Sequence, residues 1–297
     1  MSRASDALPA ALRAQIEMAL GLPIAQVEPL GQSFGTQLAR LRTSHGRFAL
    51  KWARRPLPGA LAAEAAGLRL LGQVGALRVP HVVALADPAP AEGHAFVLSE
   101  WLEGGAAVDM AALGVQLAAL HQVSAPAYGL DHDTYIGGTP QRNAWLADWP
   151  QFFAARRLVP QIELAERRGL LSAAARRNLE RLLTRLDSLL AGVERRPALL
   201  HGDLWGGNVV AADPCGVPAL IDPAVYYGDR EAEIAFTELF GGFSRAFYSA
   251  YHQAWPLDPG YADRRDLYNL YHLLNHLNLF GSGYAAQVEQ IARRYGG

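Results

Sequence analysis

The chain has 297 residues, of which 51% are hydrophobic and 19% are charged, and its formal net charge is −1 at pH 7. This length and composition are sufficient for two lobes with a sizeable buried core. The near-zero charge gives no electrostatic case for nucleic acid or a membrane surface as the main partner, so we expect neither.

The single cysteine, Cys215, excludes an internal disulfide and suits a reducing compartment. No apolar run reaches membrane-spanning length. Residues 1–22 have the pattern of an amphipathic helix and lack the apolar core of a signal peptide. We therefore expect a cytoplasmic protein, either a monomer or a weak dimer.

Near the N-terminus, a short glycine-containing loop over residues 31–36 precedes a predicted hairpin over 38–52 with its turn at 44–46. A loop in this place can cover the phosphates of a nucleotide with its backbone N–H groups and hydroxyls. The candidate phosphate-binding residues are Gly31, Ser33, Gly35 and Thr36. An ordinary turn is the alternative, because the chain holds 29 glycines and such pairs arise easily.

The hairpin ends on Lys51, the one lysine among 27 basic residues. Its context, Phe-Ala-Leu-Lys over residues 48–51, fits the Val-Ala-Ile-Lys type of strand on which kinases carry a phosphate-binding lysine. A compact ammonium fits between phosphate oxygens, whereas the guanidinium of arginine is a broad planar fork. We therefore predict that Lys51 contacts phosphate.

A helix is predicted from about residue 58 to 75, with Leu61, Leu68 and Leu71 as its apolar stripe. Glu64 falls within that stripe, where an unpaired carboxylate would be costly to bury. We therefore expect Glu64 to pair with Lys51.

A strand-like run over residues 94–102 follows and ends at two glycines. In a kinase architecture this run is the hinge, where backbone groups around Glu100 and Leu102 bond the adenine. We place the boundary of the first lobe here. Residues 1–103 are then the ATP-binding lobe, and residues 104–297 are a mainly helical lobe with the catalytic loop and acceptor site. The active site is expected between the lobes.

Residues 201–208, His-Gly-Asp-Leu-Trp-Gly-Gly-Asn, carry the strongest signal. Asp203 followed five positions later by Asn208 is the spacing that kinases use for a catalytic base and an amide ligand of Mg²⁺. Asp222, fourteen positions after Asn208, supplies a second metal ligand. Apolar runs flank these motifs, so each acid is predicted to follow a short strand. Turn-forming aspartates are the alternative for either acid alone.

A protein substrate docked as in protein kinases is disfavoured, because only residues 223–228 separate Asp222 from a helix that Asp229 could cap. The acceptor is expected in a pocket of the helical lobe. There Trp205 would offer an aromatic face to a sugar ring or an amine, unless it packs in the core.

Four arginine pairs, at 156–157, 167–168, 176–177 and 195–196, lie among acids and leucines in segments predicted to be helical. Such pairs usually lie on solvated helix faces.

The sequence resembles the fructosamine kinases, or ketosamine-3-kinases, within the aminoglycoside phosphotransferase-like branch of the protein-kinase-like superfamily. The likeness covers about residues 25–285. Four blocks carry it in order, at residues 135–143, 201–208, 230–243 and 271–280. Read without the family, the last block is a helix with Leu273, Leu277 and Phe280 inward.

The resemblance implies an α+β fold of two lobes, a small lobe with an antiparallel sheet and a mainly helical lobe. It also implies ATP- and Mg²⁺-dependent phosphorylation of the sugar 3-hydroxyl of a ketosamine, a free or protein-bound glycated amine, which leads to deglycation. Carried over by position, Asp203 is the base, Asn208 and Asp222 bind Mg²⁺, and Lys51 contacts phosphate with Glu64 as its partner. The glycine-poor loop at 31–36 departs from the family's pattern.

Two other functions use the same residues. An aminoglycoside- or choline-type kinase would need an acidic, wide acceptor pocket. A non-catalytic nucleotide-binding protein would be favoured if Asp203 or Asp222 were misplaced.

Overall fold

The computed structural model describes residues 8–87 and 93–297. The first seven residues of the predicted leading helix lie outside the described residues. None of the helices in the described part of the chain is long and apolar enough to cross a membrane.

The chain forms two compact units. The first combines residues 1–109 with 210–222, and the second combines 110–209 with 223–297. Segment 210–222 therefore groups with the first unit, although it follows the proposed boundary at residue 103. The two functional lobes, 1–103 and 104–297, stay a prediction.

The first unit is built on a five-stranded antiparallel sheet with the strand order β1-β2-β3-β5-β4. Its strands are β1 (Gln26–Ser33), β2 (Thr36–Thr43), β3 (Gly46–Ala53), β4 (Val82–Ala86) and β5 (Ala95–Glu100). The predicted hairpin is confirmed as β2 and β3, whose turn is formed by Ser44 and His45.

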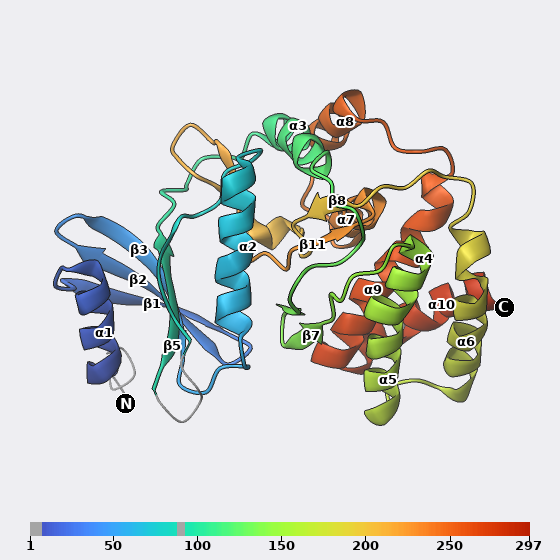
Figure 1. The fold of residues 1–297 in the computed structure, drawn as a ribbon, viewed down its shortest axis with the longest axis horizontal. Helices are drawn as coiled ribbons and strands as arrows, with labels where there is room; N and C mark the ends of the chain where they lie inside the picture. The colour runs from blue at the N-terminus through green and yellow to red at the C-terminus, as the bar shows by residue number, and fades with distance from the viewer. Residues whose placement is uncertain (1–7, 88–92) are drawn as a thin grey trace. The chain divides into compact units, whose positions relative to one another are not determined.

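Helices α1 (Ala10–Leu20) and α2 (Ala60–Val74) lie on either side of β5 (Figure 1). Leu12 of α1 and Leu50 of β3 belong to one buried cluster on the α1 side of the sheet. Because neighbouring strand residues point to opposite faces, the next residue, Lys51, points toward the α2 side. Residues 210–222 of this unit form a small pair of strands, β9 (Val209–Ala211) and β10 (Pro218–Leu220).

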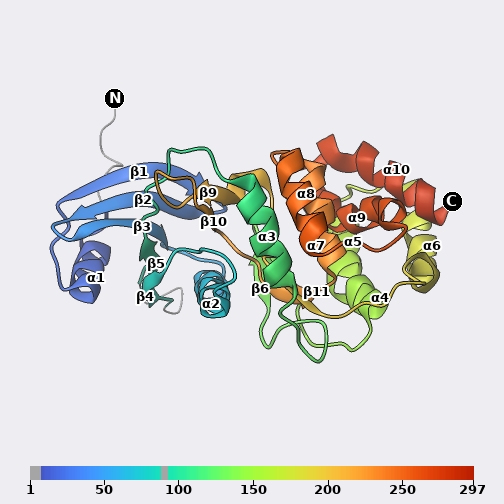
Figure 2. The same ribbon diagram turned by 90° about the horizontal axis from the view of Figure 1, so that it is seen from above.

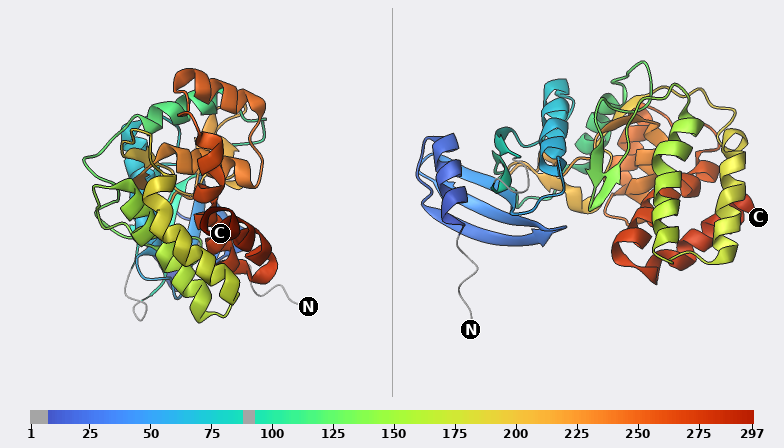
Figure 3. Two further views of the ribbon diagram at one scale, coloured as in Figure 1. Left: turned by 90° about the vertical axis from the view of Figure 1, so that its right-hand side faces the viewer. Right: turned by 60° about the horizontal axis from the view of Figure 1, so that its bottom comes forward.

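The second unit is mainly helical. Its helices are α3 (Met110–His121), α4 (Trp149–Phe152), the π-helix η1 (Phe153–Leu158), α5 (Val159–Arg167), α6 (Ala173–Leu189), η2 (Gly206–Asn208), α7 (Arg230–Leu239), α8 (Arg245–Ala254), α9 (Tyr261–Phe280), η3 (Ser282–Tyr284) and α10 (Ala285–Gly296). Two small strand pairs complete it, β6 (Thr134–Ile136) with β7 (Thr139–Gln141) and β8 (Ala198–Leu200) with β11 (Tyr226–Gly228). Helix α3 packs against α8 (Figure 2), and α6 packs against α10 (Figure 3).

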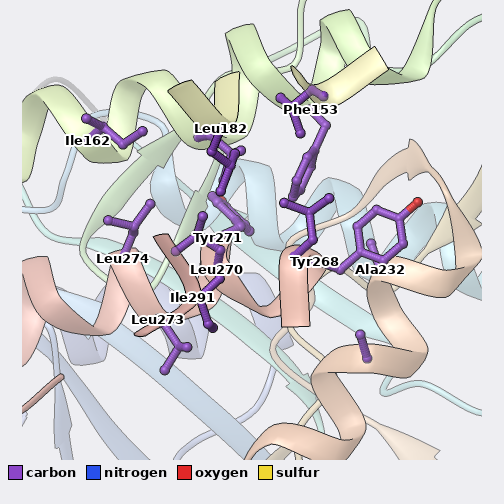
Figure 4. Close-up of a cluster of buried hydrophobic side chains, with 14 of the residues drawn as sticks. Phe153, Ile162, Leu182, Ala232, Tyr268, Leu270, Tyr271, Leu273, Leu274 and Ile291 are labelled. Carbon is purple, nitrogen blue, oxygen red and sulfur yellow. The ribbon is translucent and has the colours of Figure 1, made fainter. Parts of the chain in front are cut away.

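Helix α9 lies in the core of the second unit. Its residues Leu270 and Leu274 are fully buried among Ile162 of α5, Leu182 of α6 and Ile291 of α10 (Figure 4). Tertiary packing supplies most of the stability of helices in proteins. We therefore attribute the formation of α9 to this burial more than to the helix propensity of its residues.

One part of the α9 prediction is wrong. Leu273 and Leu277 are buried as expected, but Phe280 is 58% exposed. Phe280 is the last helical residue, before Gly281, and its ring lies beside those of His276 and Tyr284.

The prediction for the arginine pairs is also wrong in part. Arg157 is fully buried, with its guanidinium 3.9 Å from the centre of the Tyr226 ring. Arg195 lies beyond the end of α6 and bonds the Asp229 carboxylate at 2.8 Å. Both arginines have partners that are distant in sequence, which a pattern of neighbouring charges does not reveal.

Candidate active site

Residues 201–208, which the sequence predicts to be catalytic and which are called the catalytic loop below, connect strand β8 to strand β9 and end in the 3₁₀ turn η2. The amide nitrogen of Asn208 donates to the backbone oxygen of Asp203 at 2.7 Å and to its carboxylate Oδ2 at 3.2 Å. The predicted Asp–Asn pair therefore comes together. Because the Asn208 nitrogen is used inside the loop, its amide oxygen is the atom left to act as a cation ligand.

Gly202 has a conformation that other residues rarely adopt, with φ at +84°. A β carbon at this position would lie 2.0 Å from the carbonyl oxygen of Ala224. Only glycine fits here, so the shape of the loop just before Asp203 is fixed by close backbone packing.

Glu233, in the first turns of α7, holds the other side of this loop. Its carboxylate accepts hydrogen bonds from the backbone N–H of His201 at 3.0 Å and of Gly202 at 2.6 Å. His121 of α3 bonds the same carboxylate at 3.0 Å, and the other ring nitrogen of His121 bonds the Tyr251 hydroxyl at 2.8 Å.

The charge of Glu233 is stabilised inside the protein. Burial would raise its pKa, but the hydrogen bond from His121, the nearby histidines and the Gly202 N–H outweigh burial and lower the pKa below its usual value. A buried carboxylate that stays ionised can hold the two backbone amides across the neutral pH range.

In the first unit, Lys51 bonds two carboxylates. Its ammonium lies 2.7 Å from Glu64 Oε1 and 2.6 Å from Asp222 Oδ1. The predicted pairing with Glu64 is confirmed, and the direct contact with Asp222 was not foreseen. Burial would lower the pKa of Lys51, but the two negative charges outweigh burial and raise it. Lys51 is therefore charged at neutral pH.

Asp222 occupies a strained position. Its φ is +56°, in the left-handed region that residues with a β carbon rarely adopt. Such conformations cost about 1–3 kcal/mol and are concentrated at functional sites. The contact with Lys51 is one interaction that holds the carboxylate in place.

The predicted loop over residues 31–36 is mostly strand, because residues 31–33 end β1 and Thr36 begins β2, and only the two residues between these strands form a turn. Ser33 pairs with Thr36, and the two residues between them, Phe34 and Gly35, have φ of 46° and 79°. Two left-handed residues in succession are typical of the turns that close a two-residue hairpin. The pairing of strand β1 with β2 is irregular between Pro29 and Gly31.

The predicted hinge is strand β5 and the residues after it. The backbone N–H of Glu100 donates to the His81 oxygen at 2.9 Å, and its carboxylate accepts from the His81 N–H and from Arg78. The N–H of Glu100 is thus already used and is not open to adenine, whereas the expectation for the other backbone groups around Glu100 and Leu102 stays a prediction. Leu102 lies beyond the end of the strand.

Trp205 is not a core residue. Its side chain is 43% exposed, and its ring lies so close to Gly207 that a β carbon there would be 2.2 Å away. The indole is therefore available to solvent on the catalytic loop.

The sequence matches the family model described as fructosamine kinase over residues 11–295. The chain belongs to the fructosamine kinase family. Among its relatives is the "Probable ketoamine kinase" of Synechocystis sp., which is 44% identical over 78% of this chain and 77% of the relative. The chloroplastic protein-ribulosamine 3-kinase of Oryza sativa subsp. indica is 40% identical over 86% of this chain and 74% of the relative.

Solved structures of fructosamine kinase relatives have the same fold. A candidate fructosamine-3-kinase from Thermobifida fusca superposes with a TM-score of 0.86, at 33% identity, over 95% of this chain and 97% of the other. Aminoglycoside phosphotransferase APH(4)-Ia superposes with a TM-score of 0.63 at 15% identity and shows the fold alone. The resemblance to the fructosamine kinases implied a two-lobe, protein-kinase-like α+β fold, and this prediction is confirmed.

Sequence reasoning missed the two residues that hold the catalytic loop of this fructosamine kinase family member, Glu233 and His121. They lie 112 positions apart, and no local motif joins them. One signal was available in the sequence, because Glu233 lies in the 230–243 block, which begins with an Arg-Glu pair. In the structure, helix α7 is buried along nearly its full length, and a charged residue on such a helix requires a partner.

Proposed function

We propose that this protein is an ATP-dependent kinase that phosphorylates the sugar 3-hydroxyl of ketosamines. The observation that carries the proposal is the Asp203–Asn208 pair, at 3.2 Å on a loop of fixed shape, in a chain that belongs to the fructosamine kinase family. The names of the Synechocystis and rice relatives, ketoamine kinase and protein-ribulosamine 3-kinase, support the acceptor class. The enzyme is then a phosphotransferase with an alcohol group as acceptor.

Asp203 is proposed as the base that accepts the proton of the acceptor hydroxyl. Its carboxylate is held by the Asn208 amide, so one oxygen has a fixed direction. Transfer of a phosphoryl group proceeds through a loose transition state, and catalysis is mostly positioning and charge stabilisation. A carboxylate on a rigid loop meets the positioning requirement.

Lys51 is proposed to bind the nucleotide phosphates. Its charge is secured by Glu64 and Asp222, and only 19% of its side chain is exposed. Binding a phosphate replaces part of the contact with Asp222 and leaves Glu64 to orient the ammonium. The turn residues Ser33 and Thr36, with Gly31 and Gly35, are proposed to cover the phosphates.

Asn208 and Asp222 are proposed as the protein ligands of Mg²⁺. Oxygen ligands in this small number suit Mg²⁺, which is usually held by one or two side chains together with substrate phosphates. Within residues 8–87 and 93–297 no group of three or more His, Cys, Asp or Glu could hold a metal ion alone. When bound, the ion would neutralise charge on the phosphates.

The adenine is proposed to bind near Leu102 and the carbonyl side of Glu100, since the Glu100 N–H is already bonded. The exposed face of Trp205, two residues after Asp203, is proposed to contact the sugar or amine of the acceptor.

The proposal is tested by measuring ADP release with Mg-ATP and four acceptors in parallel, ribulosyl-lysine, fructosyl-lysine, kanamycin and choline. Turnover on either ketosamine supports the proposal and ranks the sugars. Turnover on kanamycin or choline alone would keep the kinase mechanism and overturn the acceptor class. Release of ADP from none of them, with ATP still bound, would contradict the proposed acceptor.

A further inference from the structure

A buried glutamine links the β6–β7 hairpin to Ala224, a residue that packs against the catalytic loop. Gln141, the last residue of β7, is 1% exposed. Its amide oxygen accepts from the Tyr271 hydroxyl at 2.8 Å. Its amide nitrogen donates to Thr134 Oγ1 at 2.8 Å and to the backbone oxygen of Ala224 at 2.9 Å. Both N–H donors and the carbonyl are thus used.

The contact with Ala224 leads directly to the catalytic loop. The N–H of Ala224 donates to the His201 oxygen at 2.9 Å. Its carbonyl oxygen is the atom that packs against Gly202, where a β carbon would be only 2.0 Å away. Gln141 therefore orients the peptide group that fixes the loop one residue before Asp203.

Tyr271 gives a second connection. It is buried on α9, and its hydroxyl donates to Gln141. Burial raises its pKa, and the Asp203 carboxylate is among the charges that act on it. The hydroxyl therefore stays protonated at neutral pH and remains a donor to the Gln141 oxygen.

The far end of the network is anchored, so Gln141 has a rigid support. Asn143, fully buried, donates from Nδ2 to Thr134 Oγ1 at 2.9 Å and accepts from Arg157 Nη2 at 2.8 Å. Arg157 belongs to the π-helix η1, and such helices occur frequently at functional sites. The 135–143 block, for which the proposed mechanism has no role, thus connects to the catalytic loop through Gln141.

We propose that Gln141 is a positioning residue for the catalytic loop, and that its amide sets the orientation of Asp203 through Ala224 and Gly202. The proposal rests on the proposed function, because Asp203 is the proposed base. The expected signature is a loss in the chemical step with little change in nucleotide binding.

The test compares Gln141→Leu with Gln161→Leu. Gln161 is a matched control, because it is also a buried glutamine of the second unit, 2% exposed, and is bonded to α9. Its Nε2 donates to Asn275 at 3.2 Å, and its Oε1 accepts from Asn278 at 2.8 Å. Both substitutions remove a buried amide, and Gln141→Leu alone frees the Ala224 carbonyl.

We expect Gln141→Leu to lower kcat about 10- to 100-fold with KM for ATP changed less than about twofold, since small misplacements of a catalytic group are costly. Gln161→Leu should leave kcat within about twofold, even where it lowers the melting temperature as much. An unchanged kcat in Gln141→Leu, or equal kcat losses in both variants per folded molecule, would overturn the proposal.

Gln141→Glu provides a readout that a purely structural role would not move. A protonated carboxyl can donate to the Ala224 oxygen, whereas an ionised one repels it. The ratio of its kcat to that of the wild type should therefore rise as pH falls from about 8 to about 6. A ratio independent of pH would contradict the proposal.

Hydrogen exchange separates this proposal from the proposed function, because it requires no turnover. Amides in residues 199–208 should exchange faster in Gln141→Leu than in the wild type or in Gln161→Leu. Unchanged exchange would overturn the positioning role even in an active kinase. Faster exchange in a protein that phosphorylates no ketosamine would support the positioning role and contradict only the acceptor class.

Discussion

At the level of single residues, Lys51 is the side chain whose replacement should affect nucleotide use most. It is bonded to Glu64 and Asp222, and a neutral side chain would leave these carboxylates without their shared cation. We predict that Lys51→Met lowers kcat/KM for ATP by about 10²-fold or more, the magnitude usual for a lost charge-stabilising donor. Steady-state kinetics with varied ATP measure this.

Arginine is the informative second substitution at Lys51. Its planar fork does not reproduce the compact ammonium between two carboxylates, so Lys51→Arg should recover little of the activity. Full activity in Lys51→Arg would contradict a specific phosphate contact.

The pKa of Lys51 is raised above its ordinary value of 10.5. The contribution of Lys51 to stability is therefore complete below pH 10.5 and is lost only as pH rises through the higher pKa of the folded state.

Glu233 gives a prediction with the opposite pH sign. Its folded pKa is below the ordinary value of 4.5, so its stabilisation is present above that pH and is lost as pH falls through the folded value. Glu233→Gln should cost about 1–3 kcal/mol at neutral pH, because a buried acceptor of two backbone amides is weakened.

Urea unfolding of wild type and Glu233→Gln at neutral and acid pH measures this difference. The gap in free energy of unfolding should narrow as the wild-type carboxylate becomes protonated. A gap that stays constant from neutral to acid pH would show that the charge of Glu233 does not hold the loop.

At the level of elements, helix α9 organises the second unit, and its buried leucines should dominate that unit's stability. Leu274 is fully buried, so Leu274→Ala removes packed methyl groups and leaves a cavity. We predict a loss of about 2–5 kcal/mol in the free energy of unfolding. Val115 on α3, 52% exposed, is the control, and Val115→Ala should change stability by less than about 0.5 kcal/mol. Equal effects of the two variants would contradict this view of the core.

Elements set by local patterns could be predicted from the sequence. The α2 stripe of Leu61, Leu68 and Leu71 gave both the helix and the inward direction of Glu64, and the structure places Glu64 at 2.7 Å from Lys51. Strands β8, β9 and β10 also lie on the predicted apolar runs. The Asp229 cap is confirmed as well, since its carboxylate accepts from the Glu231 N–H at 2.9 Å.

Features set by distant partners could not be predicted. The left-handed backbone of Asp222 and its bond to Lys51, 171 positions away, depend on how β3 and β10 fold into one unit. Arg157 belongs to an arginine pair with the sequence pattern of an exposed helix face, but its side chain is buried against Tyr226. Phe280 has helical spacing with Leu273 but lies at the end of α9, where nothing covers it fully.

At the level of the whole molecule, the residues with proposed catalytic roles are divided between the two units. Lys51, Glu64 and Asp222 belong to the first unit, and Asp203 and Asn208 belong to the second. Neither unit contains the full set, so each experiment requires the complete chain. The fructosamine kinase match over residues 11–295 likewise spans both units.

The most direct test of the central claim is to identify the phosphorylated atom in the product. Wild-type enzyme, Mg-ATP and ribulosyl- or fructosyl-lysine should yield a ketosamine whose phosphorus couples to the proton on sugar carbon 3 in ³¹P–¹H NMR. Asp203→Asn should lower the rate of its formation by about 10²–10⁴-fold, the usual contribution of a general base. Phosphate on another hydroxyl, or a product that forms equally fast in Asp203→Asn, would contradict the account.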